Sequence, residues 1–181
     1  MLAGFVGGGG NWFIETQGAN RLDSWESRWQ VGDRERPDKR IWRVNYLRIR
    51  SGVPPQRSPS DDLEQLKTEF RHVLEAIAEF SRSQNLTPFT QAFECSLARL
   101  ESPAPLDGLH HADIAPPNFL PLTANQLLGA AETAWVFGAM GSWNDLGFQG
   151  EIQAQYEEVS EKLYRLLNRV IVAAANSRAN P

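Results

Sequence analysis

The chain has 181 residues, of which 41% are hydrophobic and 22% charged, and its net charge is −4. These values are ordinary for a globular protein and argue against a disordered or fibrous chain. The single cysteine, Cys95, excludes an internal disulfide framework. The sequence shows neither a secretory signal nor an apolar run of the roughly 18 residues that a membrane span needs. We therefore expect a cytoplasmic protein that does not enter membranes.

Charge is distributed unevenly along the chain. Residues 1–59 carry 10 Lys or Arg against 6 Asp or Glu, a net charge of +4, whereas residues 60–181 carry 8 against 16, a net charge of −8. A basic segment can meet an anionic partner, or it can dock on acidic helices or face water. We favour the second interpretation, because an isoelectric point near 5.4 argues against nucleic acid as the partner.

The first third of the chain predicts three strands, after a glycine-rich arm at residues 1–10. Residues 11–16 are aromatic and β-branched, residues 25–31 alternate apolar with polar side chains, and residues 41–50 begin with the same alternation. In the third strand the apolar phase slips by one residue after Tyr46. We therefore expect a β-bulge near Tyr46, or a strand that is covered on both faces.

The rest of the chain predicts four helices, because its apolar residues recur at helical spacing. Their expected ranges are about 59–84, 88–101, 124–138 and 151–176. Helix-start signals support three of them: Pro59, Pro88 and a capping box from Thr123 to Gln126. A proline-rich loop over 103–122 separates the second helix from the third, and loops of this length tend to be functional or mobile.

These elements predict an α+β fold in a single domain over residues 1–181. A three-stranded antiparallel sheet at about 11–50 would expose one apolar face, and the four C-terminal helices can cover it. Trp25, Trp29 and Trp42 are expected to form an aromatic cluster at the centre of that interface.

No sequence motif points to catalysis, and we expect neither a cofactor nor a metal. The run Gly7–Gly10 lacks the Lys and Ser or Thr of a phosphate-binding loop, and a strand follows it rather than a helix. His110 and His111, with Asp113 close by, resemble metal ligands in type, but neighbouring residues of an extended loop point to opposite sides. Cys95 is expected to be a small core residue within a helix.

Two segments are the main candidates for binding. The connection around Trp143 combines hydrogen-bonding groups with an aromatic ring that can serve as an apolar anchor. The arginines of the third strand suit carboxylate or phosphate partners, because a guanidinium group donates two parallel hydrogen bonds. With the two loop histidines, the candidate binding residues are Ser142, Trp143, Asn144, Asp145, His110, His111, Arg43 and Arg48.

These features favour a small intracellular, bacterial-type binding or regulatory module that contacts another protein and has no catalytic activity. The alternative is a small enzyme or ligand-binding protein with a site made from the sheet, the 103–122 loop and the Ser142–Asp145 turn. A homodimer subunit is a third interpretation. The end of the last helix supports it, because Leu166, Leu167, Val170 and Ile171 make this end strongly apolar.

Overall fold

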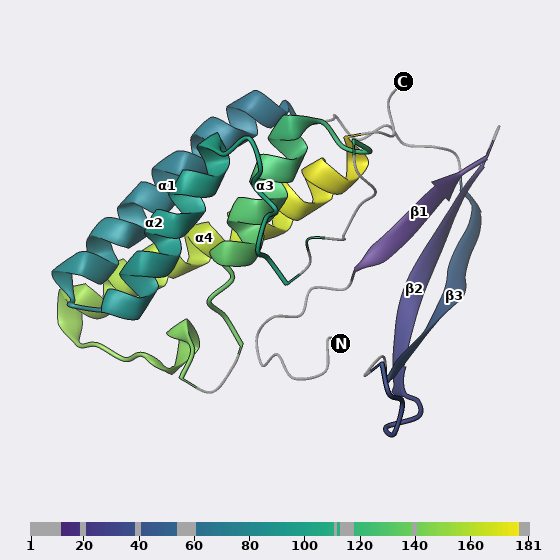
Figure 1. Ribbon diagram of the computed structural model, residues 1–181, viewed down its shortest axis with the longest axis horizontal. Helices are drawn as coiled ribbons and strands as arrows, with labels where there is room; N and C mark the ends of the chain where they lie inside the picture. The colour runs from purple at the N-terminus through teal and green to yellow at the C-terminus, as the bar shows by residue number, and fades with distance from the viewer. Residues whose placement is uncertain are drawn as a thin grey trace. The chain divides into compact units, whose positions relative to one another are not determined.

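The computed structural model of the chain describes residues 12–18, 21–38, 41–53, 61–110, 112, 118–138 and 141–177. A three-stranded antiparallel sheet is followed by four α-helices, which confirms the α+β fold class (Figure 1). Contacts within the chain define two compact units, a sheet unit and a helical unit, and each is described by itself. The expectation that the helices cover the sheet within one domain stays a prediction.

The sheet unit consists of β1 (Phe13–Gln17), β2 (Leu22–Val31) and β3 (Trp42–Val53), with β2 in the centre. Both neighbouring pairs of strands are antiparallel. Aromatic and β-branched residues alternate with polar ones in these segments, and this pattern suits a pleated sheet with one apolar side. The strands therefore form where the alternation indicates them, although β2 begins ahead of the alternating stretch.

The irregular pairing of the sheet lies near the end of β3. The register between β2 and β3 is regular as far as Arg48, with Ser27 directly opposite Tyr46. Beyond Arg48 the register shifts twice, and these shifts leave extra residues on β3. Gly52 lies in this bulged stretch with a φ of 74°, a conformation that glycine adopts without strain. The bulge expected near Tyr46 was therefore wrong in position. The pairing stays regular past Tyr46, so Leu47 lies on the opposite face of the sheet, paired with Glu26.

The helical unit is a four-helix bundle. α1 (Leu63–Ser83), α2 (Thr87–Glu101), α3 (Leu122–Thr133) and α4 (Gly150–Asn176) are its helices, and a short 3-10 helix, η1 (Trp143–Asp145), precedes α4. α1 packs on α2, α2 on α3 and α3 on α4, and α4 returns to α1 (Figure 1). The fully buried core side chains include Leu66, Phe70, Leu74, Ile77, Phe93, Leu100, Leu127, Leu163, Leu167 and Val170.

The starts of α1 and α3 differ from those expected, whereas Pro88 lies in the first turn of α2 as expected. Asp62 caps α1, since its carboxylate accepts hydrogen bonds from the backbone N–H groups of Glu64 at 2.9 Å and Gln65 at 3.2 Å. The expected capping box of α3 does not form. Pro121 is its N-cap, and the Thr123 hydroxyl donates to the carboxylate of Glu64 on α1 at 2.6 Å. The Thr123 hydroxyl, which the sequence pattern assigned to a capping box in α3, thus forms a hydrogen bond to another helix instead.

The beginning of the long loop lies against α3 at Gly129. A Cβ atom at this position would stand 2.4 Å from the carbonyl oxygen of Pro105, so no larger residue fits without movement of the backbone. Arg99 of α2 donates to the carbonyl oxygens of Pro105 at 2.5 Å and Asp107 at 3.1 Å. These contacts hold the first part of the loop between α2 and α3.

The apolar end of α4 faces the bundle. Leu167, Val170 and Ala174 are fully buried, and Leu166 is nearly so. Ala174 belongs to a cluster with residues of α3 and of the segment before it, and Ile171 packs against that cluster. The side chains that suggested a dimer helix are therefore occupied within their own unit.

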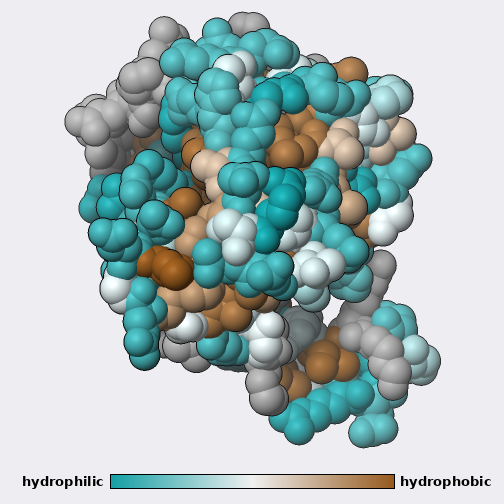
Figure 2. Space-filling model, turned by 90° about the vertical axis from the view of Figure 1, so that its left-hand side faces the viewer, coloured by the Kyte–Doolittle hydropathy of each residue, from teal (hydrophilic) through white to brown (hydrophobic). Residues whose placement is uncertain are grey.

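The outer surface of the helical unit is charged. Arg169 of α4 bonds to Asp61 at 2.7 Å and to Glu69 of α1 at 2.5 Å, and Arg71 of α1 pairs with Glu101 of α2. The face of the molecule in Figure 2 is mostly hydrophilic, with smaller hydrophobic areas between the charged side chains. Within the described part of the chain, none of the helices combines the length and the hydropathy required to cross a membrane.

Candidate functional site

One face of the sheet carries most of its large apolar side chains. Residues that pair across strands share a face, and alternate residues of one strand share it too. Ile14 is paired with Trp25, Trp29 with Val44, and Val31 with Trp42. We call this surface the aromatic face. Its large side chains are Ile14, Trp25, Trp29, Val31, Trp42, Val44 and Tyr46.

Several large side chains of the aromatic face are about half exposed. Trp29 is 44% exposed, Trp42 48% and Tyr46 55%, so these rings are not buried by the sheet unit itself. Since rings of this size bury about 150–250 Å² each when covered, these three alone expose on the order of 300 Å². Patches of that size are among the largest on ordinary protein monomers, and they often serve for binding.

The opposite face of the sheet is mixed and mainly polar. Its side chains include Glu15, Glu26, Arg28, Gln30, Arg43 and Asn45, with Phe13 and Leu47 as exposed apolar members. Arg28 and Glu26 form an exposed ion pair at 2.7 Å. Because surface pairs of this kind contribute little to stability, this face resembles an ordinary solvated surface. The sheet is therefore amphipathic, and the aromatic face is its unusual side.

Asp23 closes one end of the aromatic face. Its carboxylate accepts a hydrogen bond from the backbone N–H of Gly52 at 3.2 Å and lies 3.5 Å from the guanidinium of Arg48. A hydrogen bond from Ser51 is the main cause that lowers the pKa of Asp23, and Gly52, Arg21 and Arg48 act in the same direction, against a smaller effect of burial. Asp23 thus holds the bulged end of β3 onto β2 in its ionised form.

The two candidate arginines of β3 lie on opposite faces. Arg48 pairs with Trp25 on the aromatic face, and its guanidinium carbon stands 5.8 Å from the centre of that ring. Arg43 pairs with Gln30 on the polar face. Among the described residues Arg43 takes part in no ion pair, whereas Arg48 is already engaged by Asp23. The two residues therefore do not form one anion site.

The connection before α4 is closed by its own hydrogen bonds. The carboxylate of Asp145 accepts from the backbone N–H groups of Gly141 at 2.6 Å and Ser142 at 3.1 Å. Ser142 and Asp145 complete a capping box around η1. Asn144 is exposed at the tip, whereas Ser142 is buried. The polar residues that suggested a binding turn are used to build the turn.

Trp143 belongs to the core of the helical unit. Its side chain is fully buried, and its ring lies 5.1 Å from that of Phe89 and 5.4 Å from that of Phe93, in edge-to-face arrangements. Its indole N–H donates to Ser160 at 2.6 Å, and its carbonyl accepts from the hydroxyl of Tyr156 at 2.6 Å. Burial is the main cause that raises the pKa of Tyr156. A ring held in this way contacts no partner, so the proposed anchor is a core residue instead.

Of the two histidines of the long loop, the structure describes His110. The backbone N–H of His110 donates to Glu132 of α3 at 3.0 Å, and this bond ties the loop to the helix. His111 and Asp113 lie outside the described residues. Within the described ranges no cluster of three or more metal-ligating side chains occurs. Cys95 is exposed on α2, so its expected place in the core was wrong.

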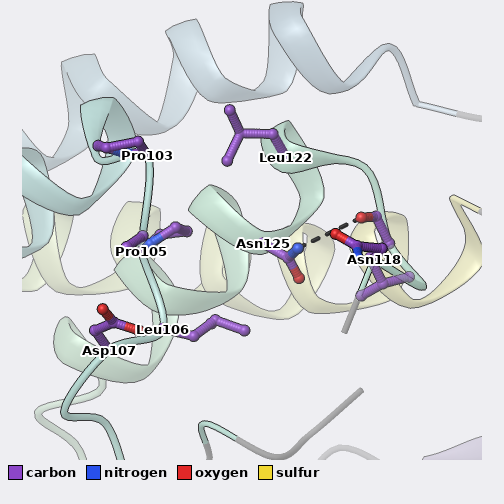
Figure 3. Close-up of a pocket in the computed structure, with 9 residues that line it drawn as sticks. Pro103, Pro105, Leu106, Asp107, Asn118, Leu122 and Asn125 are labelled. Atoms are coloured by element: carbon purple, nitrogen blue, oxygen red, sulfur yellow. Dashed lines mark hydrogen bonds between the residues drawn. The ribbon is translucent and has the colours of Figure 1, made fainter. Parts of the chain in front are cut away.

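A pocket of about 240 Å³ lies between the long loop and α3 (Figure 3). The loop residues Leu106 and Asp107 line one side, and Asn118, Leu122 and Asn125 line the other. The side-chain amide of Asn125 donates a long hydrogen bond, 3.4 Å, to the carbonyl of a neighbouring loop residue. This volume is below the roughly 300–1,000 Å³ of common small-molecule sites.

Comparisons with protein-family models, with curated proteins and with solved structures find no match. The geometry of the chain's own surfaces is therefore the basis for assigning a function. The sequence interpretation expected the apolar face of the sheet, but it missed that Trp29, Trp42 and Tyr46 are about half exposed. One signal pointed to this: the apolar stripes of α1 to α4 suffice for a bundle core without a sheet.

Proposed function

We propose that this protein is a binding module that contacts another protein through the aromatic face of its sheet. The observation that carries the proposal is the exposure of Trp29, Trp42 and Tyr46 on one side of β2 and β3. Tryptophan and tyrosine dominate the binding energy of many interfaces, because they offer a large apolar surface at a low entropic cost. The sheet supplies a rigid support for these side chains.

The polar groups of the Ser142–Asp145 turn are used within the helical unit. In the helical unit the carboxylate of Asp145 accepts hydrogen bonds from two backbone N–H groups, and burial raises the pKa of Tyr156 further above its ordinary value. The Asp145 carboxylate thus serves the turn, and the Tyr156 hydroxyl donates to a backbone carbonyl. This chemistry supports the binding function over the enzymatic alternative.

The proposal is tested by cross-linking the protein to its partners in an extract of the source cell, with two matched double variants. Trp29→Ser with Trp42→Ser alters the aromatic face, and Phe13→Ser with Leu47→Ser removes similar apolar area from the polar face. We expect the first variant to lose the captured protein and the second to keep it. Equal capture by both variants, or equal loss, would contradict the proposal.

A second candidate function is the binding of a small polar ligand in the pocket beside α3. The observation in its favour is that Asn118 and Asn125 lie next to each other at the pocket wall, with Asp107 on the opposite side (Figure 3). A thermal-shift screen with metals, nucleotides and common metabolites tests it. A ligand at 100 times its dissociation constant adds about 2.7 kcal/mol of stability, and Asn125→Ala should abolish the shift.

A further inference from the structure

The outer edge of β3 is unpaired in the described structure. β3 is the last strand in the order β1-β2-β3, and no other described strand lies beside it. It is the longest strand of the sheet, with 12 residues from Trp42 to Val53, and most of these are exposed. A free strand edge of this length is a template for pairing with another strand.

The backbone groups that face this edge follow from the hairpin pairing. The N–H of Gly32 donates to the carbonyl of Ile41 at 2.6 Å, and in an antiparallel ladder hydrogen-bonded pairs alternate with non-hydrogen-bonded ones. The register stays regular from this pair to Arg48. The residues whose backbone groups point to β2 are therefore Arg43, Asn45 and Leu47, and those whose groups point outward are Trp42, Val44 and Tyr46.

The charge of β3 restricts what can pair with it. The strand contains Arg43, Arg48 and Arg50 and no acidic residue. Arg50 pairs with Ser24 and so lies on the polar face with Arg43, and neither forms an ion pair among the described residues. Two copies of β3 side by side would bring Arg43 and Arg50 of each copy together with no carboxylate on either strand, and like charges on neighbouring strands are destabilising. The edge is therefore suited to an acidic strand and unsuited to its own copy.

We propose that this edge binds an extended, acidic segment of a partner protein, which adds to the sheet as a fourth strand beside β3. The proposal rests on the protein-binding function proposed above and names the partner's chemistry. Because side chains alternate along a strand, the segment presents apolar residues next to Trp42, Val44 and Tyr46. On the other side it presents carboxylates next to Arg43 and Arg50.

The probe is a fluorescein-labelled peptide of nine residues in which Val alternates with Glu, titrated with the full chain and followed by fluorescence polarisation. We expect saturable binding that Arg43→Glu weakens at least tenfold. Arg34→Glu is the matched control, because it makes the same charge change in the hairpin turn, away from the edge, and it should leave the affinity within twofold. A peptide with Lys in place of Glu should not bind.

Hydrogen exchange shows whether the peptide joins the sheet. On saturation, the backbone amides of Val44 and Tyr46 should exchange at least tenfold more slowly, because they gain hydrogen bonds to the new strand. Absence of saturable binding, equal binding of the Lys peptide, or unchanged exchange at these amides would overturn the edge proposal. A dimer of the chain that protects the same amides would also overturn it, in favour of a second copy.

The two proposals fail in different ways. If the Trp29 and Trp42 variant loses a cross-linked partner while Arg43→Glu keeps it, the aromatic face binds without strand addition and only the edge proposal is wrong. If the partner and the peptide are both indifferent to every variant, both proposals are wrong.

Discussion

Trp143 shows how a residue typical of binding surfaces can serve the core. Around it lie the rings of Phe80, Phe89, Phe93 and Tyr156, and its indole N–H is bonded to Ser160. The Trp143 ring thus contacts side chains of α1, α2 and α4, although Trp143 itself lies in the short helix η1. Its neighbours Ser142 and Asp145 shape the turn that delivers it.

We expect Trp143→Ala to lower the free energy of unfolding by roughly 3–5 kcal/mol, as for other buried aromatic side chains. Chemical denaturation followed by circular dichroism measures this change. Asn144→Ala is the matched control, because Asn144 is exposed in the same turn, and its effect should stay within about 0.5 kcal/mol. A small effect of Trp143→Ala would show that the ring is not packed as described.

Asp23 makes the stability of the sheet unit depend on pH, and its lowered pKa fixes the direction of this dependence. Its pKa is lowered in the folded protein, so the ionised carboxylate stabilises the fold fully above the ordinary pKa of an aspartate. This contribution is lost as the pH falls through the lowered pKa. Asp23→Asn should therefore destabilise the sheet at pH 7, and the difference from the wild type should disappear in acid.

The difference in stability between Asp23→Asn and the wild type is measured by hydrogen exchange of the β2 and β3 amides. The measurement covers pH values from neutral to about 3. A difference that grows as the pH falls would have the wrong sign and would contradict the assigned hydrogen bonds to Ser51 and Gly52.

At the scale of single elements, the close contact between α3 and the long loop depends on one glycine. In most helices Gly→Ala is stabilising by about 1 kcal/mol. At Gly129 the added methyl group would meet the carbonyl oxygen of Pro105 at 2.4 Å, and overpacking of this kind costs about 1–3 kcal/mol. The sum of these two effects decides whether Gly129→Ala stabilises or destabilises the helical unit.

We expect Gly129→Ala to destabilise the helical unit by up to about 2 kcal/mol, measured as a shift of the thermal midpoint. Gly147→Ala is the control, since a Cβ atom there would meet nothing within 4 Å. If Gly129→Ala raises the thermal midpoint instead, the loop does not lie against α3 as described.

The elements themselves were predictable from periodicity, because alternation at two residues and recurrence at 3.6 are local properties. The end of α1 and the proline at the start of α2 follow directly from such signals. The prediction of a helix cap failed where the capping residue forms a hydrogen bond to another helix. Thr123 bonds to Glu64 of α1 instead of capping α3. The slip after Tyr46 appeared in the sequence, but the register of the paired strand decided where the bulge forms.

The candidate site was less predictable than the fold. Sequence periodicity marks a side chain as one that belongs to an apolar face, but it does not say what covers that face. Trp29 and Trp143 were therefore assigned in the wrong sense: the first was expected in a core and is 44% exposed, and the second was expected at a surface and is fully buried. Only the partners of each ring in space distinguish the two situations.

At the scale of the whole molecule, the chain combines a self-sufficient helical bundle with an amphipathic sheet. The bundle buries the apolar residues of α1 to α4 among themselves. The sheet retains an apolar face whose aromatic residues are about half exposed, and a free edge that carries three arginines. Exposed apolar area of this kind is costly to keep in solution unless it is used, and the binding function gives it a use.

The most direct test of this account is hydroxyl-radical footprinting of the full chain, with oxidation of each tryptophan read by mass spectrometry. Trp143 serves as the buried reference within the same molecule. The account requires Trp29 and Trp42 to be oxidised at least tenfold faster than Trp143, and to be protected when a partner binds. Oxidation of Trp29 and Trp42 at the slow rate of Trp143 would show that the aromatic face is covered, and would contradict the proposed binding function.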